Sequence, residues 1–322
     1  MNEESISPEK ALLRTVFESR GWDIYAKRSE ILSSPEPHDW ESVDFPVEIA
    51  IELTNYCNLR CIMCPVPAMR RNRGFMDEAL FKRVAADVSR ESGFLFLPQG
   101  FGESLLHARW SRFIDFAVSL RIRPIVILTN GMLLGEEKVP SLMNSSDIVV
   151  VTVDGSTAKT YESVRVNGKF SVVTKNIEDF LKMRGHSATP HLIVRMIRMR
   201  DTQEDVEAFR TLWSGKIGRG DIIQISDCID WAGSVPYRGV VENRIQEKRH
   251  PCRMLWKNLT VYHDGRVSPC CYDAEGELVV GNVRDQSLRE IWSGRSLQNL
   301  RDSHLTCQFN RIPICSRCRN WH

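Results

Sequence analysis

The sequence lacks the features that would place the protein in a membrane or on a nucleic acid. No run approaches the ~18 apolar residues needed to cross a bilayer. The formal net charge of +2 over 322 residues gives no reason to expect nucleic acid or anionic lipid as a partner. The first residues, MNEESISPEKALL, are acidic and lack the basic-then-apolar order of a signal peptide. We therefore expect a cytoplasmic protein with no membrane and no nucleic acid among its partners.

A histidine-based metal site is not indicated either, because the eight histidines show no spacing typical of one. Cysteine is abundant by contrast, with ten residues, most of which fall in two clusters. In a reducing compartment, clustered cysteines are better explained as metal ligands than as disulfides. The rest of the composition, 42% hydrophobic and 26% charged, is ordinary for a globular protein of one large domain or two smaller ones.

Short apolar segments alternate with amphipathic segments through the first two thirds of the chain. Such alternation is typical of βαβ units and a parallel sheet, in which chemistry takes place at the carboxyl ends of the strands. Six units are too few for a closed eight-stranded barrel, so the pattern predicts an α/β fold with an open, partial (β/α)6 barrel. The predicted strands are 47–53, 94–98, 124–129, 147–154, 191–197 and 221–226, with helices at about 77–91, 108–119, before 184, and 202–213.

The two ends of the chain follow other patterns. Residues 8–19 predict a short helix, and the proline-containing residues 33–46 predict an extended lead-in. After Trp231 the alternation stops, and residues 259–271 predict a hairpin with Asp-Gly at its turn. With a boundary near 232–250, we divide the chain into a helix and lead-in (1–46), a partial barrel (47–231) and a C-terminal module (232–322).

The first cysteine cluster lies in TNYCNLRCIMCP, residues 54–65, where Cys57, Cys61 and Cys64 have the spacing C-x3-C-x2-C. All three follow the first predicted strand on one loop. Three thiolates hold three irons of a [4Fe–4S] cluster and leave the fourth iron open to a further ligand. The alternatives are a structural zinc loop or buried free thiols, but zinc prefers paired C-x2-C knuckles, and a lone triad fits it poorly.

This loop resembles the radical S-adenosylmethionine (SAM) superfamily, whose members carry such triads after the first strand of a partial (β/α)6 barrel. The resemblance implies that SAM chelates the open iron. It also implies that an electron from the cluster cleaves SAM to a 5′-deoxyadenosyl radical, which abstracts hydrogen from a substrate. A reductant of the flavodoxin or ferredoxin type is the partner that such chemistry implies.

A second part of the resemblance is QGFGESLL after the second predicted strand, which is similar to the GGEP-type motif of that family. By this resemblance Gly102 and Glu103 bind the amino group of SAM, and a carboxylate is a suitable acceptor for an ammonium group. The sequence departs from the motif in two places. Ser104 stands where proline is usual, and on simple alignment Phe101 stands where the first glycine is usual.

Four further residues are predicted to bind the cofactor. Asn130, in a Thr-Asn-Gly turn after the third strand, resembles a common turn near SAM, and Asp154 and Arg165 resemble a stretch seen in this branch of the family. On the residues alone, the Asn-Gly and Asp-Gly pairs are more often simple turns. Arg195 lies inside the fifth strand, where a charge needs a partner, which would be the SAM carboxylate or a substrate anion.

The second cluster has four cysteines around and after the predicted hairpin. Four thiolates make a closed site that suits Zn²⁺ or a fully ligated [4Fe–4S] cluster about equally. The spacing resembles a SPASM or twitch module, similar to that of 2-deoxy-scyllo-inosamine dehydrogenase-type enzymes, and the resemblance implies one auxiliary [4Fe–4S] cluster, hence two clusters in all. Its expected ligands are Cys252, Cys270, Cys315 and Cys318.

The remaining cysteines have less specific interpretations. Cys271 adjoins an expected ligand and is predicted to face away from it and pack, whereas Cys307 is an alternative ligand. Cys228 follows the sixth strand, where its thiol is either a buried small hydrophobe or a hydrogen-atom donor to a substrate radical. Asp227 and Asp230 beside it would hydrogen-bond a polyol or amine, or serve only as loop acids.

These features support several hypotheses about function. The preferred one is a radical SAM oxidoreductase of antibiotic biosynthesis that dehydrogenates a hydroxyl of an aminocyclitol, sugar or aminoglycoside, with the auxiliary cluster accepting an electron. An epimerase using Cys228 is the second. Modification of a ribosomal peptide is the third, although such enzymes usually carry a peptide-binding module for which we see no room in the roughly 45 residues before the barrel. An iron–sulfur electron-transfer or zinc-binding protein is the non-enzymatic alternative, which the open-iron triad disfavours.

Overall fold

The fold is described here from a computed structural model, which describes residue 14 and residues 22–135, 137–187, 189–218, 220–235, 239 and 249–321. The predicted helix at 8–19 lies outside these residues apart from Arg14, which is helical. Most of the predicted boundary at 232–250 lies outside them too, so the division into domains stays a prediction.

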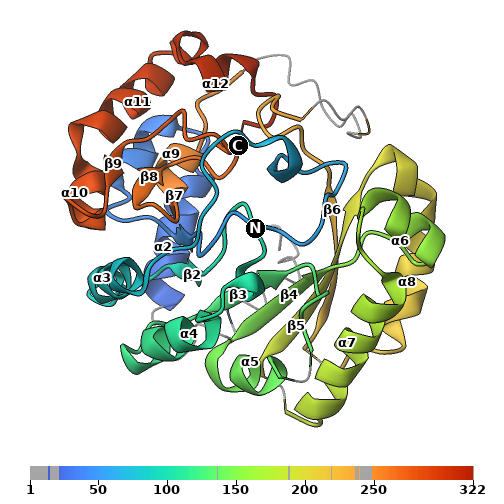
Figure 1. The fold of residues 1–322 in the computed structure, drawn as a ribbon. Coiled ribbons are helices and arrows are strands. Elements are labelled where there is room, and N and C mark those ends of the chain that lie inside the picture. Colours follow the sequence, from blue (N-terminus) through green and yellow to red (C-terminus); the bar gives the residue numbers. More distant parts are fainter. Residues whose placement is uncertain are drawn as a thin grey trace, which may run out of the picture.

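All six predicted barrel strands are present, and each lies inside its predicted range or exceeds it by one residue. They pair in parallel, as expected of βαβ units. A parallel bridge between Phe96 and Ile125 joins the two sheets, so the order is β6-β5-β4-β3-β2-β1 around an open ring (Figure 1). The strands are β1 (Glu48–Ile51), β2 (Leu95–Leu97), β3 (Val126–Thr129), β4 (Ile148–Thr152), β5 (His191–Arg198) and β6 (Ile222–Asp227).

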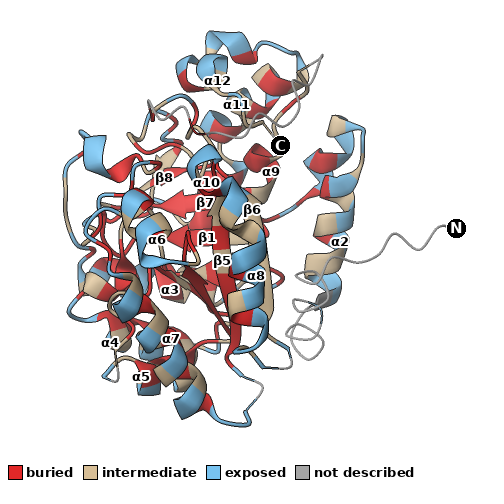
Figure 2. Cartoon of the chain, turned by 90° about the vertical axis from the view of Figure 1, so that its right-hand side faces the viewer, coloured by how far each residue is buried: buried red, intermediate tan, exposed pale blue. Residues whose placement is uncertain are grey.

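Helices cover the outside of this ring, and Figure 2 shows buried strands β1 and β5 behind helices with exposed outer faces. Local capping fixes where several of them begin, as where Asp77 accepts the Leu80 N–H at 2.7 Å. Among the described residues, no helix is both long and apolar enough to cross a membrane. The helices are α3 (Glu78–Val88), α4 (Trp110–Ser119), α5 (Val139–Ser145), α6 (Ala158–Val164), α7 (Phe170–Arg184) and α8 (Val206–Ser214).

The sequence prediction missed two features of this layer. The two-turn helix α5 was not expected, because its seven residues are too few to show a helical period. The helical stretch before residue 184 is divided into α6 and α7 around Asn167, whose φ of +70° cannot continue a helix.

The lead-in is folded rather than extended as predicted. Helix α2 (Trp22–Ser33) precedes it, and a short 3₁₀ helix, η1 (Pro37–Ser42), begins on a proline. Tyr25 of α2 packs against apolar side chains at the amino ends of the barrel strands, so α2 covers that end of the ring. Trp40 of η1 is buried edge-on to Trp256 of the C-terminal module, with 5.4 Å between ring centroids. The sequence did not predict this packing, because a segment with several prolines shows no hydrophobic periodicity.

The C-terminal module continues the barrel sheet. The predicted hairpin is confirmed as β7 (Asn258–Val261) and β8 (Arg266–Ser268), with Gly265 at φ +97° in its turn. Strand β7 pairs in parallel with β1 over four residues, so the order runs on through β1-β7-β8-β9 (Figure 1). The remaining elements are α9 (Met254–Lys257), β9 (Gly281–Asn282), α10 (Leu288–Ser293), α11 (Arg295–Leu305), η5 (Phe309–Arg311) and α12 (Pro313–Arg317).

A buried ion pair stands where β1, the cysteine loop and the hairpin meet. Both oxygens of Glu52 accept from Arg71, at 2.7 and 2.6 Å, and the two side chains are almost wholly buried. His263 Nδ1 lies 3.0 Å from the same carboxylate, which also accepts the Phe101 N–H at 3.3 Å. Arg71 lies over the ring of Tyr262, 4.2 Å from its centroid. Burial alone would raise the pKa of Glu52, but the hydrogen bonds from Arg71 and His263 lower it to about 2.

We expect Glu52→Gln to lower the free energy of unfolding by about 3–5 kcal/mol, because it leaves the Arg71 charge buried without its partner. Arg71→Met should cost a similar amount, and the double variant should cost less than the sum of the two. Anaerobic urea unfolding of the purified protein gives all three values. The matched control is Lys169→Met at the exposed Lys169–Glu162 pair, which should change stability by less than about 1 kcal/mol. Additive losses at Glu52 and Arg71 would contradict this account.

Candidate active site

A cavity of about 420 Å³ lies at the carboxyl ends of the barrel strands. This is the end at which parallel α/β sheets place their chemistry. Of the residues predicted to bind the cofactor or contact the substrate, only Asp154 and Asp230 are outside its lining. The predicted residues in the lining are Cys57, Cys61, Cys64, Gly102, Glu103, Asn130, Arg165, Arg195, Asp227 and Cys228.

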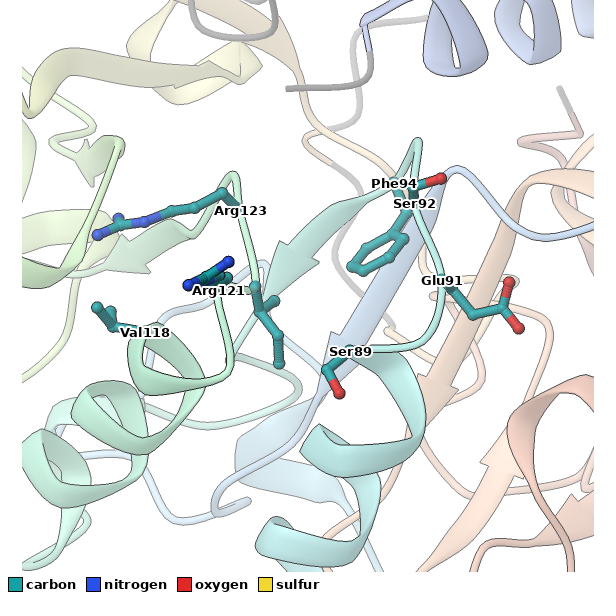
Figure 3. A pocket seen from close by; sticks show the side chains of 8 residues that line it. Ser89, Glu91, Ser92, Phe94, Val118, Arg121 and Arg123 are labelled. Carbon is teal, nitrogen blue, oxygen red and sulfur yellow. The ribbon is translucent and has the colours of Figure 1, made fainter. Parts of the chain in front are cut away.

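A larger cavity, of about 540 Å³, lies at the opposite end of the strands, between the segments that follow α3 and α4 (Figure 3). Its lining includes Glu91, Phe94, Arg121 and Arg123, which precede β2 and β3. It contains none of the residues predicted to act in chemistry. The position of the smaller cavity, rather than its size, therefore identifies the candidate site.

The cysteine loop is held against the segment after α6. The N–H groups of Arg60 and Ile62 donate to the carbonyls of Val166 and Val164, at 2.9 and 3.1 Å. Burial raises the pKa of Cys57 to about 11 and that of Cys64 to about 12. Both are therefore protonated near neutral pH in the metal-free chain, and binding of iron has to displace their protons.

The donor set fits an iron–sulfur cluster better than a single ion. Among the described residues, no three His, Cys, Asp or Glu side chains are close enough together to hold one metal ion. A [4Fe–4S] cluster instead takes its thiolates at separate corners of a cube. Three cysteines along one wall of a cavity, packed with the apolar Leu59 and Met63, match that requirement.

Two glycines bring the loop after β2 against the cysteine loop. A Cβ on Gly102 would lie 2.3 Å from the Thr54 carbonyl oxygen, and one on Gly100 would lie 2.5 Å from the Glu52 Cβ. Only glycine fits at either position. The predicted alignment had Phe101 in place of a glycine. The structure shows glycines on both sides of it, and Phe101 itself is buried.

Glu103 is buried and held by three donors. Its carboxylate accepts the Thr129 hydroxyl at 3.0 Å, the Asn130 N–H at 2.8 Å and the Leu105 N–H at 3.3 Å. Burial raises its pKa, and these hydrogen bonds oppose the rise. A carboxylate fixed in this way is a suitable acceptor for an ammonium group entering the cavity.

The turn after β3 is tied to the cysteine loop through Asn58, which the sequence analysis did not identify. The Asn130 side chain donates to the Asn58 side-chain oxygen at 2.9 Å, and its Nδ2 lies 3.8 Å from Cys57 Sγ. Asn58 stands between two cysteines and belongs to no recognisable motif. Only the spatial approach of the two loops reveals its role.

Asp154 lies behind the cavity and positions Arg165. The Asp154 carboxylate is fully buried, and it accepts Arg165 Nε at 2.6 Å and the Ile197 N–H at 2.8 Å. Arg165 in turn places Nη1 3.5 Å from Cys61 Sγ. Burial disfavours the arginine charge, but Asp154 more than offsets this and raises the Arg165 pKa well above its usual value. Arg165 is therefore a fixed cation beside the cysteine loop.

Arg195 reaches the cavity from inside β5. The Thr152 hydroxyl oxygen accepts from its Nε and Nη2 at 3.3 and 3.1 Å. Both residues line the cavity. Thr152 supplies the hydroxyl oxygen that this contact requires.

The loop after β6 contributes a thiol and a carboxylate. Cys228 is 3% exposed, and burial together with the nearby Asp154 carboxylate raises its pKa to about 12. Asp227 also lines the cavity and pairs with Arg198 at 2.7 Å. Asp230 lies outside the lining, where it accepts from the Asn320 side chain. The thiol is therefore a protonated group in the wall of the site.

The second set of cysteines surrounds a separate, smaller cavity. Apolar side chains, among them Leu278 and Ile314, complete its walls. Burial raises the pKa of Cys315 to about 12 and that of Cys318 to about 11. The structure brings together all four cysteines predicted as auxiliary ligands, which are Cys252, Cys270, Cys315 and Cys318.

The two remaining cysteines of this region lie elsewhere. Cys271 does not line the cavity, and its pKa is raised to about 12 by burial and by the Glu48 carboxylate, which is paired with Lys257. It follows β8 rather than lying within it, so a turn rather than strand alternation separates it from Cys270. Cys307 is exposed beyond the end of α11.

Two aromatic residues lie between the cavities, and the sequence analysis identified neither. Tyr272 belongs to the lining of both cavities. Trp231 packs edge-on against it, with 5.8 Å between ring centroids, and donates Nε1–H to the Met63 carbonyl at 2.9 Å. Trp231 lies outside the strands at φ +52°. No periodic signal marks a residue in such a position.

An open parallel barrel with a cysteine triad, a buried carboxylate and a second cysteine cavity defines a class of iron–sulfur enzyme. The sequence matches the Radical SAM superfamily over residues 51–212 and the SPASM iron–sulfur cluster-binding domain over residues 252–319. The chain belongs to the radical SAM superfamily and carries a SPASM domain. [4Fe–4S] clusters and SAM are the cofactors of this combination.

Known relatives differ in substrate. The chain is 23% identical to the S-adenosyl-L-methionine-dependent 2-deoxy-scyllo-inosamine dehydrogenase of Niallia circulans, over 84% of this chain and 92% of that protein. It is also 23% identical to the subtilosin biosynthesis protein AlbA of Bacillus subtilis, over 85% of this chain but 66% of AlbA. The crystal structure of BtrN with AdoMet and 2-DOIA superposes with a TM-score of 0.60 at 18% identity, covering 86% of this chain and 94% of BtrN.

We expect Gly102→Ala to weaken SAM binding at least tenfold, because the added methyl group would displace the loop that carries Glu103. Isothermal titration of the anaerobically reconstituted protein with SAM measures this. Gly215→Ala is the matched control, since nothing lies within 4 Å of a Cβ there. Unchanged SAM binding in the Gly102 variant would show that the loop does not contact SAM.

Proposed function

We propose that this protein is a radical SAM dehydrogenase that oxidises a hydroxyl-bearing carbon of a small polar molecule, an aminocyclitol, sugar or aminoglycoside. The observation that carries the proposal is the position of Tyr272 in the walls of both cavities. A substrate in the first cavity is separated from the second set of cysteines by this side chain and its neighbours. Oxidation of an alcohol releases electrons, so an acceptor site next to the substrate has a chemical purpose.

In this proposal Cys57, Cys61 and Cys64 would hold a [4Fe–4S] cluster that binds SAM. When a flavodoxin- or ferredoxin-type protein reduces that cluster, the cluster and SAM would together supply a 5′-deoxyadenosyl radical. Glu103 accepts the SAM ammonium group. Asn130 braces the cysteine loop through Asn58. Gly102 allows the close approach of the two loops.

The two arginines of the site bind negative charge. Arg165 is held by Asp154 and lies closest to the cysteine loop, whereas Arg195 lies deeper along β5. Either guanidinium suits a carboxylate, because its planar donors match the two oxygens. We assign the pair to the SAM carboxylate and to an anionic or hydroxyl group of the substrate.

The hydrogen atom lost from the carbinol carbon would be taken up by the 5′-deoxyadenosyl radical to give 5′-deoxyadenosine, which leaves a carbon radical on the substrate. Loss of the hydroxyl proton to solvent and of one electron then gives a ketone. Asp227 is the carboxylate in the cavity lining that can hydrogen-bond the hydroxyl. Cys252, Cys270, Cys315 and Cys318 would hold a second [4Fe–4S] cluster, which would supply an acceptor for this electron.

The extent of the matches leaves both substrate classes open. The dehydrogenase is matched over 92% of its length, and the structure of anSMEcpe with AdoMet and a bound peptide is matched over 90% of its chain. Peptide modification is the alternative substrate class. A panel of aminocyclitols and peptides, assayed for SAM-dependent product, separates the two.

A second candidate reaction rests on Cys228. Its buried, protonated thiol lines the same cavity, and a thiol can return a hydrogen atom to a carbon radical. Return to the opposite face of that carbon would invert it and leave a thiyl radical on Cys228, which an electron from the reductant and a proton from solvent would convert back to the thiol. The protein would then be an epimerase rather than a dehydrogenase.

We expect the anaerobically reconstituted protein to contain about eight iron and eight sulfide per chain, and the variants Cys57→Ala and Cys315→Ala to contain about four. Incubation with SAM and dithionite should yield 5′-deoxyadenosine from the parent protein and from Cys315→Ala but not from Cys57→Ala. Cys307→Ala is the control, because that cysteine is exposed and away from both cavities. About four iron with bound zinc in the parent protein would remove the auxiliary cluster.

The fate of the product distinguishes the two reactions. For a dehydrogenase, Cys228→Ala should leave ketone formation within about threefold of the parent, and product made in deuterated water should carry no deuterium on the reacting carbon. Mass spectrometry of the product measures both. Inverted product with one solvent deuteron, abolished in Cys228→Ala, would establish the epimerase instead.

A further inference from the structure

Two side chains that line the second cavity, His304 and Arg249, each have a buried nitrogen with no hydrogen-bond partner among the described residues. His304, at the end of α11, lines this cavity beside the four cysteines and is 1% exposed. Its Nε2 is buried and makes no hydrogen bond to any described residue. A buried donor without a partner is costly and uncommon, so it calls for an occupant of the cavity that accepts a hydrogen bond.

The hydrogen bond at the other ring nitrogen assigns the tautomer. The backbone N–H of Cys252 donates to His304 Nδ1 at 3.1 Å. Nδ1 therefore uses its lone pair as an acceptor and carries no proton, so the ring proton is on Nε2. An Nε2 that carries a proton cannot be a ligand of iron, but it is a hydrogen-bond donor.

Packing keeps the ring in place. The His304 ring lies 5.6 Å from that of Phe309, centroid to centroid, and Arg249 covers the Phe309 ring at 4.2 Å. One turn earlier in α11, buried Arg301 donates to the carbonyls of Leu255 and Trp292, which anchors the helix. Reorientation of the ring would disturb these contacts.

We propose that His304 donates its Nε2–H to a sulfur atom of the auxiliary cluster and thereby raises the reduction potential of that cluster. The proposal rests on the assignment of the second cavity to a [4Fe–4S] cluster. Hydrogen bonds to cluster sulfur stabilise the reduced state, which carries one more negative charge. A higher potential makes the cluster a better acceptor for the electron that leaves the substrate.

Two substitutions test this donor. His304→Phe keeps a flat ring of similar size and removes both nitrogens, whereas His304→Gln retains an acceptor for the Cys252 N–H and an N–H donor. Met254→Leu is the matched control, because Met254 lines the same cavity and carries no donor. Redox titration of each reconstituted protein, followed by electron paramagnetic resonance, measures the potentials of both clusters.

In His304→Phe we expect the equilibrium constant for reduction of one cluster to fall about tenfold, equivalent to about 59 mV for a one-electron couple. The other cluster should be unaffected, and His304→Gln and Met254→Leu should stay within about threefold of the parent. A parent-like potential in His304→Phe with about eight iron per chain would overturn the proposal.

A second measurement decides the case in which His304→Phe loses the auxiliary cluster. The parent protein labelled with ¹⁵N-histidine should show a weak nitrogen coupling to the reduced auxiliary cluster in pulsed paramagnetic resonance. Absence of that coupling would overturn the role of His304 while leaving the two-cluster assignment intact. About four iron in the parent protein would overturn the two-cluster assignment itself.

Discussion

The buried Glu52–Arg71 pair is the interaction on which the rest of the arrangement depends. A carboxylate removed from water costs several kcal/mol unless its oxygens are fully satisfied. Here the donors come from the segment after the cysteine loop, from the loop after β2 and from the hairpin of the C-terminal module. The charge on Glu52 can be satisfied only when these segments are assembled around it. The pair therefore fixes the position of the barrel segments that line the first cavity relative to the module that contains the second.

The barrel and the C-terminal module are also joined by a shared sheet. Strand β7 occupies the edge of β1, the position at which a closed barrel would continue its ring. The edge of β1 is thereby paired rather than exposed. The pairing of β7 with β1 also brings the turn after β8, with Cys270 and Tyr272, to the mouth of the barrel. The short path between the cavities follows from strand pairing rather than from a flexible linker.

Much of the fold could be predicted from local pattern, because parallel strands are short apolar runs and their helices are amphipathic. The segments that escaped prediction lack such a period. Helix α5 is too short, η1 begins on proline, and Trp231 lies in a left-handed turn. Asn58 and His304 escaped for another reason. Each acts through a partner distant in sequence, such as His304 with Cys252, and no spacing rule connects them.

The sequence by itself determined the chemistry of the protein. Cysteine spacing, a glycine–glutamate loop and strand order are local properties, and they identify a cluster-binding partial barrel. Only the tertiary structure decided how those parts cooperate. It placed Asp154 behind Arg165 instead of in the cavity and put Tyr272 in the walls of both cavities. It also placed His304 in the wall of the second cavity, where its Nε2 has no hydrogen-bond partner among the described residues. The physical reason is that burial and hydrogen-bond satisfaction depend on contacts between distant segments, which local spacing does not encode.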